Sequence, residues 1–172
     1  MSTRRGEDFD DFFRELYPRA FRAARRISSD EGSAEDAALE ALTKAFVRWP
    51  TVRAMPYRDA WVLRVAINEA LGQLRRIGRR PSRPGLARSD ASNDLADVLA
   101  TRLALASALR RLPRRQREAI ELRYLADFTE DDTASALGVS NGTVKTHLHR
   151  AAASLRILLD KDLLQELLDV RS

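Results

Sequence analysis

The sequence of 172 residues contains no cysteine. This absence excludes a disulfide scaffold, a thiolate metal site and a cysteine nucleophile. The sequence also has no run of about 18 uninterrupted apolar residues, the length that a membrane-spanning helix needs. Its beginning, MSTRRGEDFDDFF, becomes acidic where a secretory signal would become apolar. We therefore expect a cytoplasmic protein.

Glycine and proline are also scarce, with seven and six residues, whereas Ala, Leu and Arg are abundant. This composition favours an all-α fold. Apolar residues recur with helical spacing over residues 9–27, 58–77, 94–111, 114–125 and 141–159. Ser33, with Asp36 as its capping partner, is predicted to open a further helix. The apolar stripe of that helix is predicted to be Ala38, Ala41, Leu42, Ala45 and Phe46. Thr129, with Asp132 as its capping partner, is predicted to open another short helix.

The periodicity fails between Gly78 and Asn93, where GRRPSRPGLARSDASN combines Pro, Gly, Ser and Arg. Such a composition is typical of a flexible linker. We therefore expect two small helical domains joined by a flexible linker. The first has three helices and spans residues 8–78, the linker spans 79–93, and the second has four helices and spans 94–160. Residues 161–172 form a weakly helical tail.

The charges are segregated along the chain. Of the 30 basic residues three are Lys and the rest Arg, and the net charge is +5. Six Arg and no acid lie between Arg75 and Arg88, and six more Arg without an acid lie between Arg102 and Arg117. Residues 30–40, in contrast, contain five acids and no base. This pattern indicates separate surfaces for an anionic polymer and for a basic protein partner, although each run alone is also consistent with a solvated helix face.

The most specific pattern is TASALGVSNGTVKTHLHRA, residues 133–151. Ala134 is small enough for two helices to cross closely, and Gly138 supplies the positive φ of a tight turn between them. Val144 and Leu148, four residues apart, anchor the inner face of the second helix. This is the pattern of a helix-turn-helix, whose second helix enters the major groove of DNA. A simple helical hairpin remains the alternative.

The outward face of this second helix carries groups suited to DNA. Amide, hydroxyl and imidazole groups read base edges, whereas Lys and Arg bind phosphates. The candidate residues are Asn141, Thr143, Lys145, Thr146, His149 and Arg150.

A second group of candidates lies between residues 49 and 80, where aromatic side chains alternate with Arg. Single-stranded DNA needs this combination, because bases stack on aromatic rings while Arg binds the backbone. The candidate residues are Trp49, Arg53, Trp61, Arg64, Asn68, Arg75 and Arg76. For the aromatic residues a place in the core is an equally open interpretation.

No catalytic or metal-binding constellation is present. His147 and His149 are two residues apart on a helix and point to nearly opposite faces, so they cannot share a metal ion. The sequence has no HExxH, GxSxG, P-loop or GxGxxG motif. We therefore expect neither enzymatic activity nor a cofactor.

Five segments together resemble bacterial sigma factors of the extracytoplasmic-function group, the small two-domain members of the sigma-70 family. In region 2 of that family the similar segments are DDFFRELYPRAFRAARRI, AEDAALEALTKAF and AWVLRVAINEALGQLRR. In region 4 they are ALRRLPRRQREAIELRYL and SALGVSNGTVKTHLHRA. The resemblance covers about residues 9–160 and keeps the order of the five segments.

The resemblance implies a function and partners. The acidic helix would dock on core RNA polymerase, with Glu35, Asp36 and Glu40 as candidate contacts. The 49–57 loop and the helix after it would melt and capture the −10 element of the promoter, and helix 141–150 would read the −35 element. The resemblance also implies an anti-sigma protein as a further partner. Leu39, Leu42 and Gly72 depart from the usual pattern, as does the pair Asp132–Thr133.

Three other interpretations stay open at this stage. GTVKTHL also resembles the recognition helix of regulators that bind a palindromic operator as a dimer. That interpretation leaves the aromatic and Arg residues at 49–80 unexplained. A hydrolase lacks any supporting constellation, and the polar face at 141–150 argues against a pure protein-interaction adaptor. We also expect the free protein to bind promoter DNA weakly, because two modules on a tether bind strongly only when both are placed together.

Overall fold

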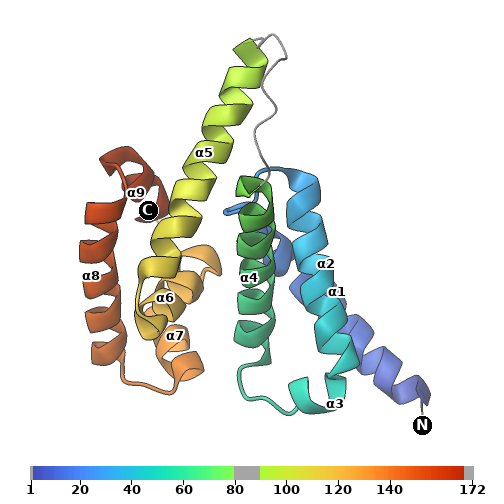
Figure 1. Cartoon of the computed structure of the whole chain (residues 1–172). Helices are drawn as coiled ribbons and strands as arrows, with labels where there is room; N and C mark the ends of the chain where they lie inside the picture. Colours follow the sequence, from blue (N-terminus) through green and yellow to red (C-terminus); the bar gives the residue numbers. More distant parts are fainter. Residues whose placement is uncertain (1, 80–89, 169–172) are drawn as a thin grey trace.

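A computed structural model of the chain describes residues 2–79 and 90–168, and all regular elements in these ranges are helices (Figure 1). The elements are α1 (Ser2–Arg25), α2 (Glu31–Val47), α3 (Trp49–Val52), α4 (Arg58–Gly78), α5 (Asp90–Arg111), α6 (Arg114–Ile120), the π-helical turn η1 (Glu121–Leu125), α7 (Glu130–Leu137), α8 (Asn141–Leu158) and α9 (Lys161–Leu168). The predicted all-α class is confirmed. Most of the predicted linker, residues 80–89, lies outside the described residues, and α5 begins four residues before the predicted Asp94.

Helices α1, α2 and α4 pack against one another and form what we call the N-terminal half, with α3 at one end (Figure 1). The buried face of α2 consists almost entirely of alanine: Ala34, Ala37, Ala38, Ala41 and Ala45, with Leu42 among them. The small side chains of α2 let α1 and α4 approach it closely. The larger buried side chains of α1 and α4 then fill the core of the N-terminal half. Phe46, predicted to belong to this apolar stripe, is instead 48% exposed.

Asp30, and not Ser33, opens helix α2. The Asp30 carboxylate accepts hydrogen bonds from the Ser33 backbone N–H and from the Ser33 hydroxyl, each at 2.8 Å. These bonds hold the pKa of Asp30 below its ordinary value. The predicted pair Ser33–Asp36 was wrong. Asp30 is equally suited to an N-cap and lies three residues earlier, so it adds nearly one turn to α2 and places a negative charge at the N-terminus of the helix.

Helices α5 to α9 form the C-terminal half, and its helix-turn-helix has the predicted local geometry. The Thr129 hydroxyl accepts from the Asp132 N–H, and the Asp132 carboxylate accepts from the Thr129 N–H, as expected of a capping box. Gly138 ends α7 with φ 65°, and Ser140 caps α8 through the Thr143 N–H at 3.2 Å. The predicted cap at Thr129 and the predicted positive φ at Gly138 are both confirmed.

Substitution of Gly138 by alanine is expected to lower the free energy of unfolding by about 1–2 kcal/mol, the cost of a left-handed conformation for a residue with a Cβ. A Cβ at Gly138 would meet no atom within 4 Å, so the effect would be conformational and not steric. Chemical denaturation measures it. Gly142→Ala, in the first turn of α8, is the matched control and should be neutral or stabilising. Equal losses at both positions would contradict the assignment of the turn.

The helix predicted over residues 114–125 changes its winding after Ile120. The Ala126 N–H donates to the Glu121 carbonyl at 2.9 Å, five residues back, and the Phe128 N–H donates to the Leu122 carbonyl at 3.0 Å. Asp127, just after the turn, has a positive φ of 59°. Among the described residues, Gly138 is the other residue with a positive φ. A π-helical turn shifts the register of the side chains. Here Glu121, Leu122 and Leu125 are all buried.

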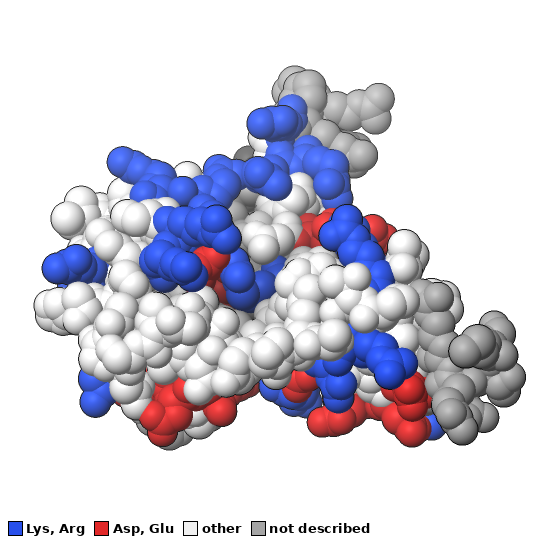
Figure 2. Space-filling model, turned by 90° about the horizontal axis from the view of Figure 1, so that it is seen from below, with Lys and Arg blue, Asp and Glu red and all other residues white. Residues whose placement is uncertain are grey.

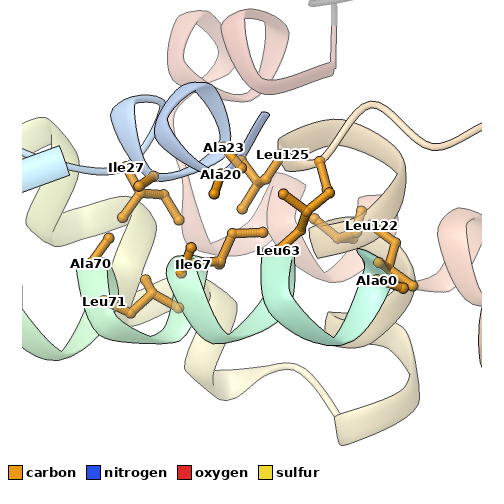
Figure 3. Packing of buried hydrophobic residues seen from close by; sticks show 14 of the residues in the cluster. Ala20, Ala23, Ile27, Ala60, Leu63, Ile67, Ala70, Leu71, Leu122 and Leu125 are labelled. Carbon is orange, nitrogen blue, oxygen red and sulfur yellow. The ribbon is translucent and has the colours of Figure 1, made fainter. Parts of the chain in front are cut away.

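The two halves pack directly on one another, which the sequence did not predict. Figure 3 shows Leu122 and Leu125 of the C-terminal half among Ala20, Ala23, Ala60 and Leu63 of the N-terminal half. All these residues belong to one buried cluster that extends through both halves. We call this contact surface the seam; its polar members include Arg26 and Arg64 on one side and Arg102, Glu118, Glu121 and Asp127 on the other.

Candidate nucleic-acid and polymerase interfaces

Helix α8 presents its predicted polar face outward. Val144 and Leu148 are buried against the rest of the C-terminal half, whereas the Lys145 side chain is 66% exposed. Thr143 is half-buried, and the remaining members of the predicted face are exposed: Asn141, Lys145, Thr146, His149 and Arg150. The orientation of the helix is therefore as predicted. His147 is half-buried and His149 exposed, so these two imidazoles do not face one point.

Acidic residues of α7 hold part of this face in the free protein. Asn141 donates a hydrogen bond to Asp131, and Lys145 lies 3.7 Å from the Glu130 carboxylate. Exposed contacts of this kind contribute little to stability. DNA phosphates would therefore replace them at small cost, and the carboxylates keep the two side chains near the surface that DNA would approach.

Trp49 requires a correction. Predicted to stack on unpaired bases, it is only 2% exposed and lies in the core of the N-terminal half. Its ring centroid is 5.1 Å from that of Phe9 and 4.9 Å from that of Phe12. The loop predicted here begins instead with the short helix α3, which turns the indole inward. Burying this large apolar ring is more favourable than leaving it in water, so Trp49 is a core residue. No base can reach it in this conformation.

The other candidates on this side of the molecule are more accessible. Arg53 is exposed and lies 3.7 Å from Asp8, Trp61 is half-buried, and Asn68 is exposed. The Asn68 Nδ2 donates to the Arg64 carbonyl one turn back at 2.8 Å. Arg75 and Arg76 are exposed in the last turn of α4.

The structure adds residues to this basic region that sequence reasoning did not select. Arg79 and Arg110 line an open cleft of about 540 Å³ together with Arg75, between the end of α4 and α5. Figure 2 shows the molecule from below. Lys and Arg side chains gather along one edge of this view and near its middle. The two arginine runs in the sequence contained these residues, but only the packing of α5 on α4 brings them together.

Arg64 is the one predicted DNA-binding residue that the seam occupies. Its Nη2 donates to Oε1 of Glu118 at 2.8 Å, and its Nε lies 3.5 Å from Glu121. Both glutamate side chains are only 1% exposed. Arg64 is thus bound by two buried carboxylates from the other half of the molecule.

The two carboxylates differ in their electrostatics. Burial disfavours the charged form of Glu118, but its contacts with Arg114, Arg64 and Arg115 outweigh burial and lower its pKa. Glu121 lies 3.5 and 3.6 Å from its arginine partners, distances too long for strong hydrogen bonds. Burial therefore dominates at Glu121 and raises its pKa. Glu118 is a stabilised anion, whereas ionised Glu121 costs folding free energy.

Glu121→Gln is expected to raise the free energy of unfolding at neutral pH. A carboxyl group whose pKa is raised in the folded state binds protons more readily there than in the unfolded chain, so stability falls as pH rises above the ordinary pKa of 4.5. The variant lacks this loss, and its advantage should vanish below about pH 4.5. Urea unfolding at several pH values measures the difference. The stability of the variant minus that of the parent should be larger at neutral pH than at pH 4. The opposite order would contradict this assignment.

The predicted polymerase-binding residues all lie on the exposed side of α2. Glu35, Asp36 and Glu40 are exposed, and Glu40 lies 3.4 Å from Lys44. Lys44 also pairs with Glu69 of α4, which fixes one edge of the acidic surface. The proximity of Glu35 contributes, after burial, to a raised pKa of Tyr17 on α1.

Exposed apolar side chains on α2 complete this surface, and sequence reasoning missed them as a group. Leu39, Phe46 and Val47 are exposed on the same helix, Val47 by 70%. The sequence signal was present, because alanines alone account for nearly the whole buried stripe and leave the larger side chains outside. An acidic helix with exposed apolar residues fits a protein partner.

The chain is thus an all-helical protein of two halves, one of which contains a helix-turn-helix. The family described as Sigma-70 region 2 matches residues 12–80, and the family described as Sigma-70, region 4 matches residues 102–155. These ranges correspond to the N-terminal half and to most of the C-terminal half. None of the helices in the described ranges has the length and apolar character of a membrane span.

Curated relatives are similar over nearly the whole chain. The RNA polymerase sigma-E factor of Streptomyces coelicolor is 34% identical over 153 residues, which are 87% of this chain and 84% of the relative. The ECF RNA polymerase sigma factor SigM of Mycobacterium tuberculosis is 34% identical over 151 residues, 88% of this chain and 76% of the relative. The chain belongs to the sigma-70 family of RNA polymerase sigma factors, in its extracytoplasmic-function group.

Two solved structures of similar fold are complexes. The sigma factor RpoE with the anti-sigma factor NepR, from Bartonella quintana, has a TM-score of 0.50 and 27% identity, and the match covers 96% of this chain and 99% of that one. CnrH in complex with the cytosolic domain of CnrY has a TM-score of 0.53 and 26% identity, with 91% and 90% covered.

Proposed function

We propose that this chain binds core RNA polymerase in the cytoplasm and directs it to a specific set of promoters, as a specificity factor and not as a catalyst. The observation that carries the proposal is helix α8, which buries Val144 and Leu148 and exposes a polar face, in a chain that also matches Sigma-70 region 2 over residues 12–80. One half suits duplex DNA, and the other suits an opened strand. Transcription initiation needs both.

In this proposal the first functional domain spans residues 8–78, the linker 79–93 and the second domain 94–160, followed by a tail at 161–172. Lys145 and Arg150 bind phosphates of the −35 element, while Asn141, Thr143, Thr146 and His149 face base edges. These side chains lie on one helix face and all but the half-buried Thr143 are exposed, which supports the assignment.

Region 2 acts on the −10 element with the members of its predicted set other than the buried Trp49: Arg53, Trp61, Arg64, Asn68, Arg75 and Arg76. Guanidinium groups bind the backbone of an opened strand, and the exposed amide of Asn68 is placed to read the edge of an extruded base. Trp49 supports this surface from beneath by fixing α3 against α1.

Helix α2 docks on the polymerase. Glu35, Asp36 and Glu40 supply charge complementary to a basic surface, and Leu39 and Phe46 supply apolar contact area. Acidic residues at the edge and apolar residues at the centre are the usual anatomy of a protein interface. The similar structure of RpoE in complex with the anti-sigma factor NepR supports a protein of that kind as a further partner.

The proposal is tested by adding the purified chain to core RNA polymerase on fragmented genomic DNA and mapping the 5′ ends of the transcripts. New start sites that share two spaced sequence elements are expected. The regulator alternative predicts instead that the chain alone binds a palindromic operator as a symmetric dimer, without any new start site.

Lys145→Ala is expected to weaken binding of the polymerase complex to the −35 element about equally for all sequences. Loss of one phosphate contact reduces the slope of log affinity against log salt concentration by about one. Filter binding between low and physiological salt measures the slope. His149→Ala is the matched comparison, because loss of a base contact changes sequence preference and leaves the slope nearly constant. A changed base preference in the Lys145 variant would show that Lys145 reads a base.

A further inference from the structure

We propose that the cleft between the end of α4 and α5 binds a small ligand that carries several phosphate groups on a flat ring system, that is, a nucleoside polyphosphate. The lining of this cleft comes from both halves of the molecule: Arg75, Gly78 and Arg79 from α4, and Leu103, Ala106 and Arg110 from α5. Such a site goes beyond the proposed function, because it requires neither promoter DNA nor RNA polymerase. The charge of the cleft, its apolar floor and its size support this site.

The cleft carries positive charge that the described part of the chain does not neutralise. Arg75, Arg79 and Arg110 are exposed, and no carboxylate is among the described residues that line the cleft with them. Over residues 2–79 and 90–168 none of these three guanidinium groups forms an ion pair, in contrast to Arg64, which binds Glu118 at 2.8 Å. A concave surface lined by one sign of charge focuses the electric field and attracts counter-ions. The cleft therefore favours an anion.

Three arginines on two sides of one cleft favour a chain of phosphates over a single small anion. The planar guanidinium group donates two parallel hydrogen bonds to a phosphate and is always charged. Arg75 and Arg79 are four residues apart and therefore lie on the same face of α4. Arg110 belongs to the facing helix. Consecutive phosphate groups can contact all three side chains, whereas one carboxylate offers too few oxygens.

The floor of the cleft between the arginines is apolar. A Cβ at Gly78 would lie 3.0 Å from Cδ2 of Leu103, so the lack of a side chain at Gly78 lets α5 approach α4 closely here. Figure 1 shows the two helices side by side at this point. Leu103 is half-buried and keeps part of its apolar surface accessible. A flat aromatic ring covers such a surface favourably, and guanidinium planes stack on aromatic rings.

The size of the cleft suits a single small molecule. Its volume of about 540 Å³ falls within the range of about 300–1,000 Å³ that is usual for ligand pockets. Free phosphate would occupy a small part of this volume and leave the apolar floor in water. A nucleoside polyphosphate uses both parts of the cleft, because its base covers the floor while its phosphates reach the arginines.

A bound ligand would contact both halves at once, since Arg79 and Arg110 come from different halves. A ligand that binds the folded chain and not the unfolded chain stabilises the folded state by mass action. ATP is therefore expected to raise the midpoint of thermal unfolding of the full chain, and the rise should grow with ATP concentration.

Titration calorimetry of the full chain with two probes, ATP and inorganic tripolyphosphate, tests the site. The buffer contains no magnesium, because the cation would compete with the arginines for the phosphate oxygens. Both probes should bind, and added salt should weaken both. ATP should bind about fivefold more tightly or better, since the base adds contacts to the floor that tripolyphosphate cannot make.

Substitutions in the cleft separate its two parts. Arg79→Gln and Arg110→Gln, at positions outside the predicted −10 set, should each weaken both probes by about tenfold or more. Leu103→Gln retains the length of the side chain but makes the floor polar, so it should weaken ATP and leave tripolyphosphate unchanged. Arg156→Gln on α8 removes an exposed arginine away from the cleft and is the control, with binding like that of the parent. Circular dichroism verifies that each variant retains its helix content.

Absence of ATP binding would overturn the proposal. So would equal losses in the Arg110 and Arg156 variants, because they would show a general attraction by net charge. A hexathymidylate that displaces ATP and binds more tightly through Arg79 and Arg110 would also overturn it, since the cleft would then hold a nucleic-acid strand. These titrations contain no polymerase and no promoter, so their outcome is distinguishable from a failure of the proposed function.

Discussion

Trp49→Ala is expected to lower the free energy of unfolding by about 3–5 kcal/mol, the usual cost of truncating a buried tryptophan to alanine. The indole is 2% exposed and joins α3 to α1 through Phe9 and Phe12. Its removal would leave a cavity beneath the loop that precedes α4. Thermal unfolding with near-ultraviolet circular dichroism measures the loss.

Trp49→Phe tests whether Trp49 stabilises the fold through the packing of its ring and not through its N–H group. The indole Nε1 has no hydrogen-bond partner, so phenylalanine removes an unsatisfied buried N–H while retaining most of the ring. It should therefore be much less destabilising than alanine. Trp61→Ala, at a half-buried position, is a second comparison and should cost less than Trp49→Ala. If Trp49→Ala left stability unchanged but abolished binding to the −10 strand, the tryptophan would be a base-stacking residue after all.

Arg64→Ala is expected to reduce capture of the −10 strand by the polymerase complex by about 10- to 100-fold. Hydrogen bonds to charged groups contribute about 1.5–3 kcal/mol, and each 1.4 kcal/mol is a factor of ten in affinity. To bind a backbone phosphate, Arg64 would exchange its ion pair with Glu118 for one with DNA. Binding of the complex to a forked promoter fragment with a single-stranded −10 element measures the effect.

The same substitution has a second consequence in the free protein, because it leaves Glu118 and Glu121 buried without their partner from the other half. Glu118 keeps Arg114 and Arg115, and Glu121 keeps Arg117 at 3.6 Å, so both carboxylates lose only the compensation that comes from the N-terminal half, and the contact between the halves should weaken. The Arg14→Ala variant, which loses an exposed arginine on α1, is the matched control for loss of one positive charge. Equal binding by the Arg64 and Arg14 variants would exclude Arg64 from the −10 surface.

The helix-turn-helix was predictable because its signals are local. Thr129 with Asp132, Gly138 and Ser140 each determine the backbone within four residues, and the spacing of Val144 and Leu148 determines which face is buried. Interactions of this range are fully present in a single sequence. The same reasoning placed α4 to within one residue of its observed end.

Features that depend on distant segments were not predictable. The π-helical turn at Glu121–Leu125 adjusts the register of buried side chains to a surface formed by α1 and α4. Trp49 is buried only because α1 brings Phe9 and Phe12 over it. Arg64 and Arg26 have the composition of solvent-exposed residues, and their partners are 54 and about 100 positions away in the chain.

Asp30 and Phe46 illustrate an intermediate case. The sequence contained two possible caps for α2, Asp30 and Ser33, and helical spacing placed Phe46 next to a buried stripe. Which cap is used and how wide the buried stripe becomes depend on how closely α1 and α4 approach, and the alanines of α2 allow an approach that leaves Phe46 outside.

Permanganate reactivity of a promoter selected with this chain tests the central claim most directly. Unstacked thymines react, so reactivity marks an opened strand. Reactive thymines are expected in the −10 element only when core polymerase and the chain are both present, together with protection of the −35 element that the chain alone does not give. Protection of a palindromic site by the chain alone, with no reactive thymine in the presence of polymerase, would contradict it.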